Sequence, residues 1–230
     1  PILTGDGVLP HMGWRVGIVA GGPLLTHRPG RAGEYARQGL WRGETVWAAF
    51  AATATRVTVK AAVIEGGVGT SFAALGAAAE GLAGGLAGLG IGPGDVVSFQ
   101  LPNWTETLVV LLACARLAAI ANPILPIYRR RELGFILGEA GARVLFVPGR
   151  YRGFDHRALA HELHAELPAL AHVVVVRDDP TGGALPWDRL ATGLPPAGPA
   201  PADAGAVALL IYTSGTTADA KGVLHSHDTL

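Results

Sequence analysis

The stretch VVSFQLPNWTETLVVLLACARLAA, residues 96–119, decides the fold of this chain. Residues 96–101 form a short apolar run of the length expected for a buried strand. Residues 104–119 form a longer, mostly apolar run with the length of a helix, and two residues remain between the runs for a turn. This order predicts a strand-turn-helix unit.

Upstream of this unit the sequence predicts two helices and a hairpin. Residues 44–54 and 72–89 have apolar side chains at helical spacing, and Ser71 is placed to cap the second helix. Residues 57–64 are rich in β-branched side chains, and the glycine pair at 66–67 predicts a hairpin turn directly after them.

Downstream, strands continue to alternate with helices. We expect residues 122–123, Asn-Pro, to end the helical region that begins at 104. The further expected elements are helices at 131–140 and 157–166 and strands at 144–147, 173–176 and 206–212. This alternation predicts an α/β fold with a mostly parallel sheet covered by helices.

The pattern divides the chain into three parts. Residues 1–42 lack a sustained period and are expected to form an arm with few regular elements. Residues 43–201 are expected to form an α/β subdomain that ends in a Pro-rich surface loop or linker at 194–201. Residues 202–230 would then begin a second subdomain.

Composition excludes several classes of function. The 230 residues are 50% hydrophobic and carry 18 acidic and 18 basic side chains, so the sequence predicts neither nucleic-acid binding nor attraction to an anionic membrane. The longest apolar stretch, 108–121, contains Arg116 and is shorter than the ~20 residues of a membrane span. A single cysteine and no visible signal sequence predict a cytoplasmic protein.

The chemically informative stretch follows the expected strand at 206–212. It reads TSGTTADAKG, residues 213–222, with four hydroxyl side chains and a glycine in five positions. Hydroxyl and backbone N–H groups can donate to phosphate oxygens, and Lys221, one of only two lysines, adds positive charge. The stretch predicts a polyphosphate-binding loop, and a Ser/Thr-rich surface turn is the structural alternative.

A Walker loop is the other phosphate-binding alternative. Gly215 and Lys221 stand at the distance of its first glycine and its lysine. The Walker pattern requires glycine where Ala220 stands and Ser or Thr where Gly222 stands, and it opens a helix, whereas residues 222–224 favour a strand. The sequence therefore does not predict a Walker loop.

The loop resembles the phosphate loop of the adenylate-forming superfamily of acyl-CoA synthetases, luciferases and peptide-synthetase adenylation domains. The resemblance covers residues 43–230 in order, and within the acyl-CoA synthetase branch it is nearest to cyclohexanecarboxylate or medium-chain acyl-CoA ligases. It implies that the chain is the incomplete large amino-terminal domain of such an enzyme. The matching segments are 212–217, 221–223, 70–75, 92–97, 101–104 and 119–133.

The resemblance implies an ATP-dependent reaction in two steps. A carboxylic acid would react with MgATP to give an acyl-AMP and pyrophosphate, and coenzyme A would then take the acyl group. Lys221 would be catalytic, and Thr217 would lie near magnesium. By analogy, the β- and γ-phosphates would be held by Thr213, Ser214, Gly215, Thr216, Thr217 and Lys221.

Two positions depart from the family's pattern: Ala218 stands where glycine is usual, and Ala220 stands where proline is usual. The departures, with the absence of the family's later motifs, leave a non-catalytic nucleotide-binding module open as an alternative. An adenylation domain that loads a carrier protein is a second alternative. The resemblance also leaves a homodimer open.

Other polar groups have structural interpretations. Three histidines between 156 and 164 and a pair at 225 and 227 are expected on solvated or partly buried faces and not in a metal site. Residues 129–131, three arginines, are expected to pair with Glu132 or a neighbouring carboxylate. Cys114 is expected to fill the core, and Trp104 to serve packing.

Overall fold

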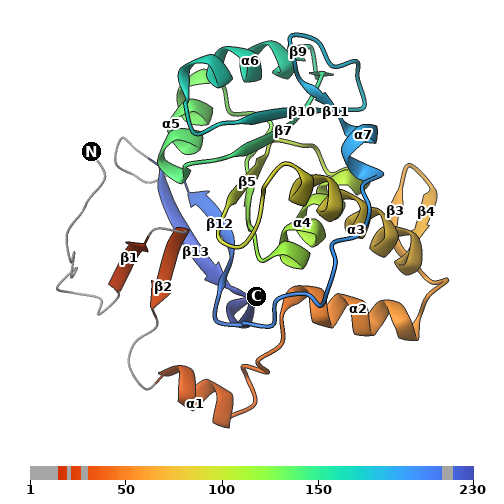
Figure 1. Cartoon of the computed structure of the whole chain (residues 1–230), viewed down its shortest axis with the longest axis vertical. Helices are drawn as coiled ribbons and strands as arrows, with labels where there is room; N and C mark the ends of the chain where they lie inside the picture. The colour runs from red at the N-terminus through yellow and green to blue at the C-terminus, as the bar shows by residue number, and fades with distance from the viewer. Residues whose placement is uncertain (1–14, 20–21, 27–30, 214–219) are drawn as a thin grey trace.

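A computed structural model describes residues 15–19, 22–26, 31–213 and 220–230. Its centre is a mostly parallel sheet, which within the described residues has seven strands (Figure 1). In spatial order these are β11 (Leu185–Pro186), β10 (His172–Val176), β7 (Val144–Pro148), β5 (Val96–Phe99), β6 (Ile120–Pro123), β12 (Val207–Thr213) and β13 (Lys221–Ser226). Only the β12–β13 pair of these described neighbours is antiparallel. The predicted α/β fold is confirmed.

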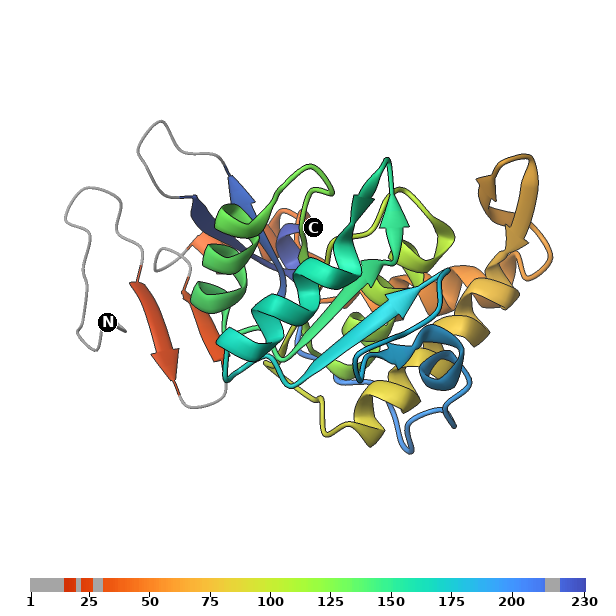
Figure 2. The ribbon, with the colours of Figure 1, turned by 90° about the horizontal axis from the view of Figure 1, so that it is seen from above.

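Helices cover both faces of this sheet, as Figures 1 and 2 show. One face carries α3 (Phe72–Gly88) and α4 (Thr105–Leu117), and the other carries α5 (Arg130–Ala140) and α6 (His156–Glu166). Because side chains alternate along a strand, Val97 and Phe99 of β5 enter the first core while Val96 enters the second.

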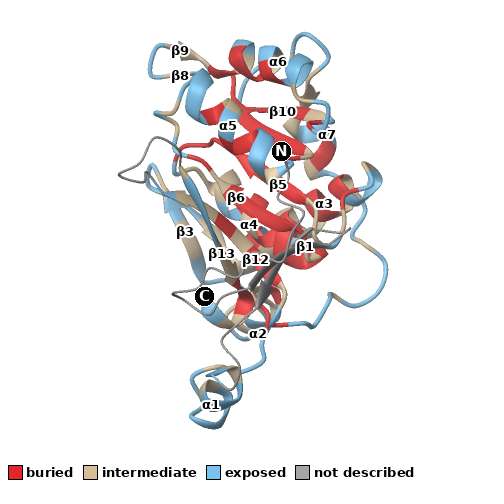
Figure 3. Cartoon of the chain, turned by 90° about the vertical axis from the view of Figure 1, so that its left-hand side faces the viewer, coloured by how far each residue is buried: buried red, intermediate tan, exposed pale blue. Residues whose placement is uncertain are grey.

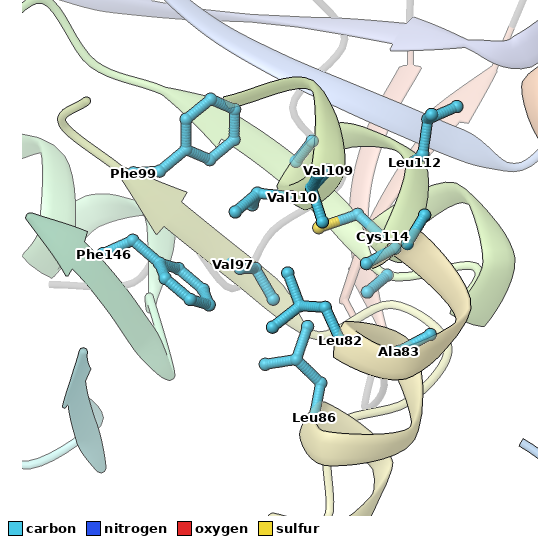
Figure 4. Packing of buried hydrophobic residues seen from close by; sticks show 14 of the residues in the cluster. Leu82, Ala83, Leu86, Val97, Phe99, Val109, Val110, Leu112, Cys114 and Phe146 are labelled. Carbon is cyan, nitrogen blue, oxygen red and sulfur yellow. The ribbon is translucent and has the colours of Figure 1, made fainter. Parts of the chain in front are cut away.

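The core on the α3–α4 face shows how the 96–119 stretch is built into the fold. Figure 4 shows Val97 and Phe99 pointing toward Leu82 of α3 and Val110 of α4, with Cys114 among them. These side chains are almost completely shielded from solvent, and Figure 3 shows the same layer as a continuous buried centre. The predictions of a buried strand, a buried helix and a core cysteine are confirmed.

The prediction for residues 118–123 was wrong. Helix α4 ends at Leu117, and Ala118 adopts a left-handed conformation with φ 54°. Residues 120–123 then form β6, a parallel strand between β5 and β12, where the sequence analysis expected only the end of a helical region. Four mostly small residues directly after an apolar helix carry no alternating pattern, so periodicity cannot separate them from the helix.

Before the sheet, the chain forms more regular elements than the sequence predicted. Residues before 43 include the hairpin of β1 (Arg15–Val19) and β2 (Gly22–Thr26) and the helix α1 (Arg31–Arg37). Helix α2 (Val46–Arg56) follows, and then the predicted hairpin, formed by β3 (Ala61–Glu65) and β4 (Val68–Ser71). As predicted, Ser71 caps α3, because its side chain accepts a hydrogen bond from the Ala74 amide at 3.1 Å.

Short elements complete the fold: β8 (Arg150–Tyr151), β9 (Phe154–Asp155), α7 (Trp187–Ala191) and the 3₁₀ turn η1 (His227–Thr229). The Pro-rich segment 194–201 packs against the body, since the buried Arg116 donates to the carbonyls of Pro196 and Gly198. No helix in the described part of the chain is long and apolar enough to span a membrane. The division at residues 201 and 202 stays a prediction.

Candidate functional site

The predicted phosphate loop connects the two strands of an antiparallel hairpin. Thr213 is the last residue of β12 and Lys221 the first of β13, and the two are direct partners across the hairpin. The Thr213 hydroxyl donates to the Lys221 carbonyl oxygen at 3.5 Å, and both residues are exposed. The structure therefore brings together two of the six predicted phosphate-binding residues, at the two ends of the loop.

The other predicted loop residues lie outside the described residues, and their roles stay predictions. The same holds for the assignment of magnesium to Thr217 and for the conformation at Ala218. The predicted phosphate-binding residues that lie outside the described residues are Ser214, Gly215, Thr216 and Thr217.

The hairpin opens at the edge of the sheet where parallel α/β folds bind ligands. Strands β5, β6 and β12 run parallel, so Phe99, Pro123 and Thr213 mark one common carboxyl edge. Crevices outside the carboxyl ends of parallel strands are the usual ligand sites of open α/β sheets. The position of the loop is therefore the one expected for a bound substrate.

Tyr212 connects the hairpin to an apolar cavity at this edge. The cavity has a volume of about 300 Å³, and we call it the edge cavity. Burial, with a smaller effect of the negative charge of Glu139, raises the pKa of the Tyr212 phenol well above its ordinary value, so the group stays neutral. The cavity is lined by Phe99, Leu101, Asn103, Thr107, Pro123, Ile124, Leu125, Pro126, Tyr128, Ile136, Ile211 and Tyr212.

A second cavity, of about 450 Å³, lies beside the first and is more polar. We call it the arginine cavity, because Arg129 and Arg152 line it together with Trp104, Tyr151 and His156. The Arg152 guanidinium carbon lies 5.4 Å from the centre of the Tyr151 ring. Neither cavity could be predicted from the sequence, since their walls come from segments far apart in the chain.

One wall of the arginine cavity is held by a network of charges around Arg177. Its guanidinium pairs with Glu65 and Glu106 and stacks 4.4 Å from the centre of the Trp104 ring. Hydrogen bonds from Arg177, with those from the Thr105 amide and hydroxyl, lower the pKa of Glu65 to about 2. The network ties the hairpin β3–β4 to the start of α4, and it gives Trp104 the packing role that the sequence predicted.

The histidines of α6 do not come together. His156 is buried and contacts Gln100, while His164 contacts the Leu170 carbonyl oxygen. Within the described ranges, no group of three His, Cys, Asp or Glu side chains could hold a metal ion. His227 does not share β13 with His225, because it begins η1, where its Nδ1 accepts a hydrogen bond from the Val46 amide at 3.2 Å.

Two further structural interpretations are confirmed with changed detail. Arg130 pairs with Glu162 and Glu166 of α6 and not with Glu132, whose carboxylate instead accepts from the Arg129 amide at the start of α5. Cys114 is buried, and desolvation raises the pKa of its thiol to about 12, which excludes a thiolate nucleophile at neutral pH.

A larger cavity of about 670 Å³ lies between α2, α4 and β12. Its lining includes Thr45, Leu111, Leu209 and His227 but neither end of the phosphate loop. Size alone therefore does not identify the site. The edge cavity is the better candidate, because Ile211 and Tyr212 in its lining directly precede Thr213 at the end of β12.

The chain belongs to the family of AMP-binding enzymes, whose model matches residues 50–230. It is 37% identical over 211 residues to the 2-hydroxy-7-methoxy-5-methyl-1-naphthoate–CoA ligase of Streptomyces carzinostaticus, with 86% of this chain and 37% of the relative covered. It is 32% identical over 211 residues to the medium-chain fatty-acid–CoA ligase of Escherichia coli, with 90% and 37% covered. The predicted membership of the adenylate-forming superfamily is confirmed.

Other relatives are named for adenylation rather than for a CoA product. The salicyl-AMP ligase / salicyl-S-ArCP synthetase of Mycobacterium tuberculosis is 38% identical over 204 residues, with 86% of this chain and 36% of that protein covered. The apo structure of MbtA from Mycobacterium smegmatis is similar with a TM-score of 0.78 and 32% identity, covering 90% of this chain and 38% of that one. The chain thus spans little more than a third of the length of these relatives.

Proposed function

We propose that this chain supplies the phosphate-binding part of an ATP-dependent ligase that converts a carboxylic acid to an acyl-AMP and then to a thioester. The observation that carries the proposal is the hairpin β12–β13, which holds Thr213 and Lys221 across from each other at the carboxyl edge of the sheet. Tyr212, which directly precedes Thr213 in β12, lines an apolar cavity that could receive an organic substrate.

In the first step, a carboxylate oxygen attacks the α-phosphorus of ATP. The bond from this phosphorus to the oxygen that bridges to the β-phosphorus breaks, and pyrophosphate leaves with the electron pair. No proton is transferred, so the step requires no general base. Positive charge at Lys221 and donors such as the Thr213 hydroxyl would stabilise the negative charge that develops on the leaving group.

Magnesium bound with ATP would supply additional neutralisation of the phosphate oxygens. A threonine hydroxyl is a hard oxygen donor that suits this ion, and Thr217 is the residue that we propose beside it.

In the second step, the sulfur of a thiol acceptor attacks the acyl carbonyl carbon. The bond between this carbon and the phosphate oxygen breaks, AMP leaves with the electron pair, and the thiol proton passes to solvent. We propose coenzyme A as the acceptor, because two of the relatives named above are CoA ligases. A carrier-protein thiol is the alternative, supported by the relative named as a salicyl-S-ArCP synthetase.

Carboxylate-dependent exchange of labelled pyrophosphate into ATP by the full-length protein tests the first step. We expect exchange with at least one member of a panel of aliphatic and aromatic carboxylic acids, and none without acid. If no acid supports exchange, the adenylation proposal fails. Supplying coenzyme A or a carrier protein to an active preparation then identifies the acceptor.

A non-catalytic nucleotide-binding module is the second candidate, favoured by Ala218 and Ala220 at positions where the resembled family has glycine and proline. A methyl group at position 218 limits positive φ and close approach to a phosphate. Calorimetry that detects MgATP binding in a protein without exchange activity would support this candidate.

A further inference from the structure

Gln100 is a polar side chain buried at the carboxyl edge of the sheet. It directly follows β5, has no exposed surface, and its backbone amide donates to the Phe146 carbonyl oxygen at 2.8 Å. Burying an amide side chain is costly unless its groups find partners. The hydrogen-bond partners of the Gln100 side chain therefore indicate its structural role.

Both hydrogens of the Gln100 amide hold one loop. Nε2 donates to the carbonyl oxygens of Leu125 and Tyr128, each at 3.0 Å. Oε1 accepts from His156 Nδ1, also at 3.0 Å. His156 begins α6 and is itself buried, so it can hold the Gln100 amide in the single orientation that presents two donors to the loop.

The loop in question is residues 124–129, which we call the wall segment. Leu125 and Tyr128 line the edge cavity, Ile127 and Arg129 line the arginine cavity, and Pro126 lines both. The segment thus lies between the edge cavity and the arginine cavity.

Burial alone does not hold the wall segment in place. Leu125 and Ile127 have 55% and 69% of their surface exposed, so their side chains contribute little apolar burial. Ile124 anchors one end in the core, and at the other end Arg129 donates to the Pro126 and Tyr128 carbonyl oxygens. Between these anchors, the half-buried Tyr128 side chain packs against the core, and Gln100 supplies the hydrogen bonds to the segment from inside the protein.

We infer that Gln100, oriented by His156, is a positioning residue that sets the wall segment and so the binding of the organic substrate whose chain lies along it. This inference rests on the proposed ligase function. The shared chemistry is an elongated organic chain, which the carboxylic acid presents as its apolar group and coenzyme A as its thiol-bearing arm. ATP is held by a different element, the hairpin β12–β13.

The test compares Gln100→Met with Ser98→Ala in the full-length protein. Methionine keeps the length and volume of the side chain but removes all three hydrogen bonds. Ser98 is the matched control, because it is buried on β5 two residues before Gln100, and its hydroxyl accepts a hydrogen bond at 2.9 Å from Asn122 of β6 and not from the wall segment.

Gln100→Met is expected to raise the KM for the carboxylic acid in the exchange assay, or the KM for coenzyme A in thioester formation, by about tenfold or more. The two KM values tell which substrate lies along the wall. The KM for ATP is expected to stay within about twofold, and Ser98→Ala is expected to leave all three KM values within the same range. Unchanged KM values in Gln100→Met, or equal changes in both variants, would overturn the inference.

His156 supplies a second comparison. Asparagine can place an N–H group near the position of Nδ1, whereas leucine cannot, so His156→Asn is expected to lie closer to the wild type than His156→Leu in the affected KM. Equal effects of the two substitutions would remove His156 from the positioning role.

Hydrogen exchange measures how firmly the wall segment is held in place, and this measurement requires no enzyme activity. The amides of residues 124, 125 and 127–129 are expected to exchange about tenfold faster or more in Gln100→Met, and at the wild-type rate in Ser98→Ala; Pro126 has no amide hydrogen. Unchanged exchange in Gln100→Met would refute the positioning role even if the wild type shows no ligase activity. Inactivity of the wild type with altered exchange in the variant would instead refute the proposed function alone.

Discussion

Lys221 and Lys60 are the only lysines of the chain, and they stand in different surroundings. Lys221 begins β13 opposite Thr213, at the base of the predicted phosphate loop. Lys60 is an exposed residue in the turn after α2, far from this hairpin in sequence and joined to Val57 by its backbone. Substitution of Lys221 can therefore be compared with substitution of Lys60, which removes the same charge at another place on the surface.

We predict that Lys221→Ala lowers the rate of carboxylate-dependent pyrophosphate exchange by about tenfold or more, because the positive charge would stabilise the leaving pyrophosphate in the transition state. Lys60→Ala is expected to keep the wild-type rate, since it removes the same charge elsewhere on the surface. Equal rates in all three proteins would exclude Lys221 from the site.

Because His156 is buried, we predict that the stability of the fold depends on pH. Burial, with the nearby positive charge of Arg129, lowers its pKa to about 4, against a smaller opposing effect of Asp155. The unfolded chain, with an ordinary pKa of about 6.5, therefore binds a proton that the folded protein does not bind until the pH is near 4. Folding is thus favoured above pH 6.5 and is weakened as the pH falls from 6.5 toward 4.

The size of this effect is about 3 kcal/mol over that range, at about 1.4 kcal/mol for each unit of pKa. Urea unfolding at pH 7.5 and pH 4.5 measures it, and His156→Asn is expected to lose less stability on acidification than the wild type. Parallel losses in the two proteins would show that other groups carry the acid sensitivity.

Among the elements, α3 depends on the absence of side chains along one face. The segment 190–194 crosses this helix so closely that a Cβ at Gly81, Gly84 or Gly85 would overlap a backbone carbonyl oxygen. The sequence does not single out these glycines, because a glycine in a helical pattern does not reveal what packs on it. Their role depends on a loop more than a hundred residues later in the chain.

Gly84→Ala is expected to destabilise the protein by about 2 kcal/mol or more, since the Leu194 carbonyl oxygen occupies the position of the new methyl group and backbone must move. Gly88→Ala is the matched control at the end of the same helix, where nothing lies within 4 Å of the new atom. It is expected to be neutral or stabilising by up to about 1 kcal/mol. The urea concentrations at the midpoint of unfolding measure the two effects. Equal midpoints for Gly84→Ala and Gly88→Ala would contradict the close packing at Gly84.

The helices and strands that span many apolar residues were predictable, whereas β6 was not. Helix α3 and strands β5, β7 and β10 each carry a clear apolar pattern, so their positions followed from the sequence. Asp95 precedes β5, and Gly, Pro or a charged residue stands at or directly after the end of the other three. Strand β6 has only four residues directly after α4, and the left-handed turn at Ala118 that separates them uses an alanine instead of the usual glycine.

For the molecule as a whole, the sheet joins two cores and carries the site at one edge. Arg116 of α4 shows how distant parts are linked: it pairs with Glu80 of α3 and donates to carbonyls of the segment 194–201. Because a ligand that binds the folded chain and not the unfolded one stabilises the whole fold, ligand binding at the edge of the sheet should raise the global stability.

We predict that MgATP raises the melting temperature of the full-length protein. A ligand at one hundred times its dissociation constant stabilises the folded state by about 2.7 kcal/mol. Lys221→Ala is expected to need a higher MgATP concentration for the same shift, whereas Lys60→Ala should need the same concentration as the wild type. A melting temperature that does not respond to MgATP would contradict nucleotide binding.

Local sequence was sufficient for the α/β class and for most of the elements, because apolar periodicity is a property of neighbouring residues. A dense group of hydroxyls in neighbouring residues also predicts the phosphate loop, and this assignment stays a prediction. The strand order, the edge cavity, the arginine cavity and the role of Gln100 followed only from the folded chain. Each of these joins residues tens of positions apart, and a buried amide such as Gln100 reveals its purpose only through the carbonyls that accept its hydrogen bonds.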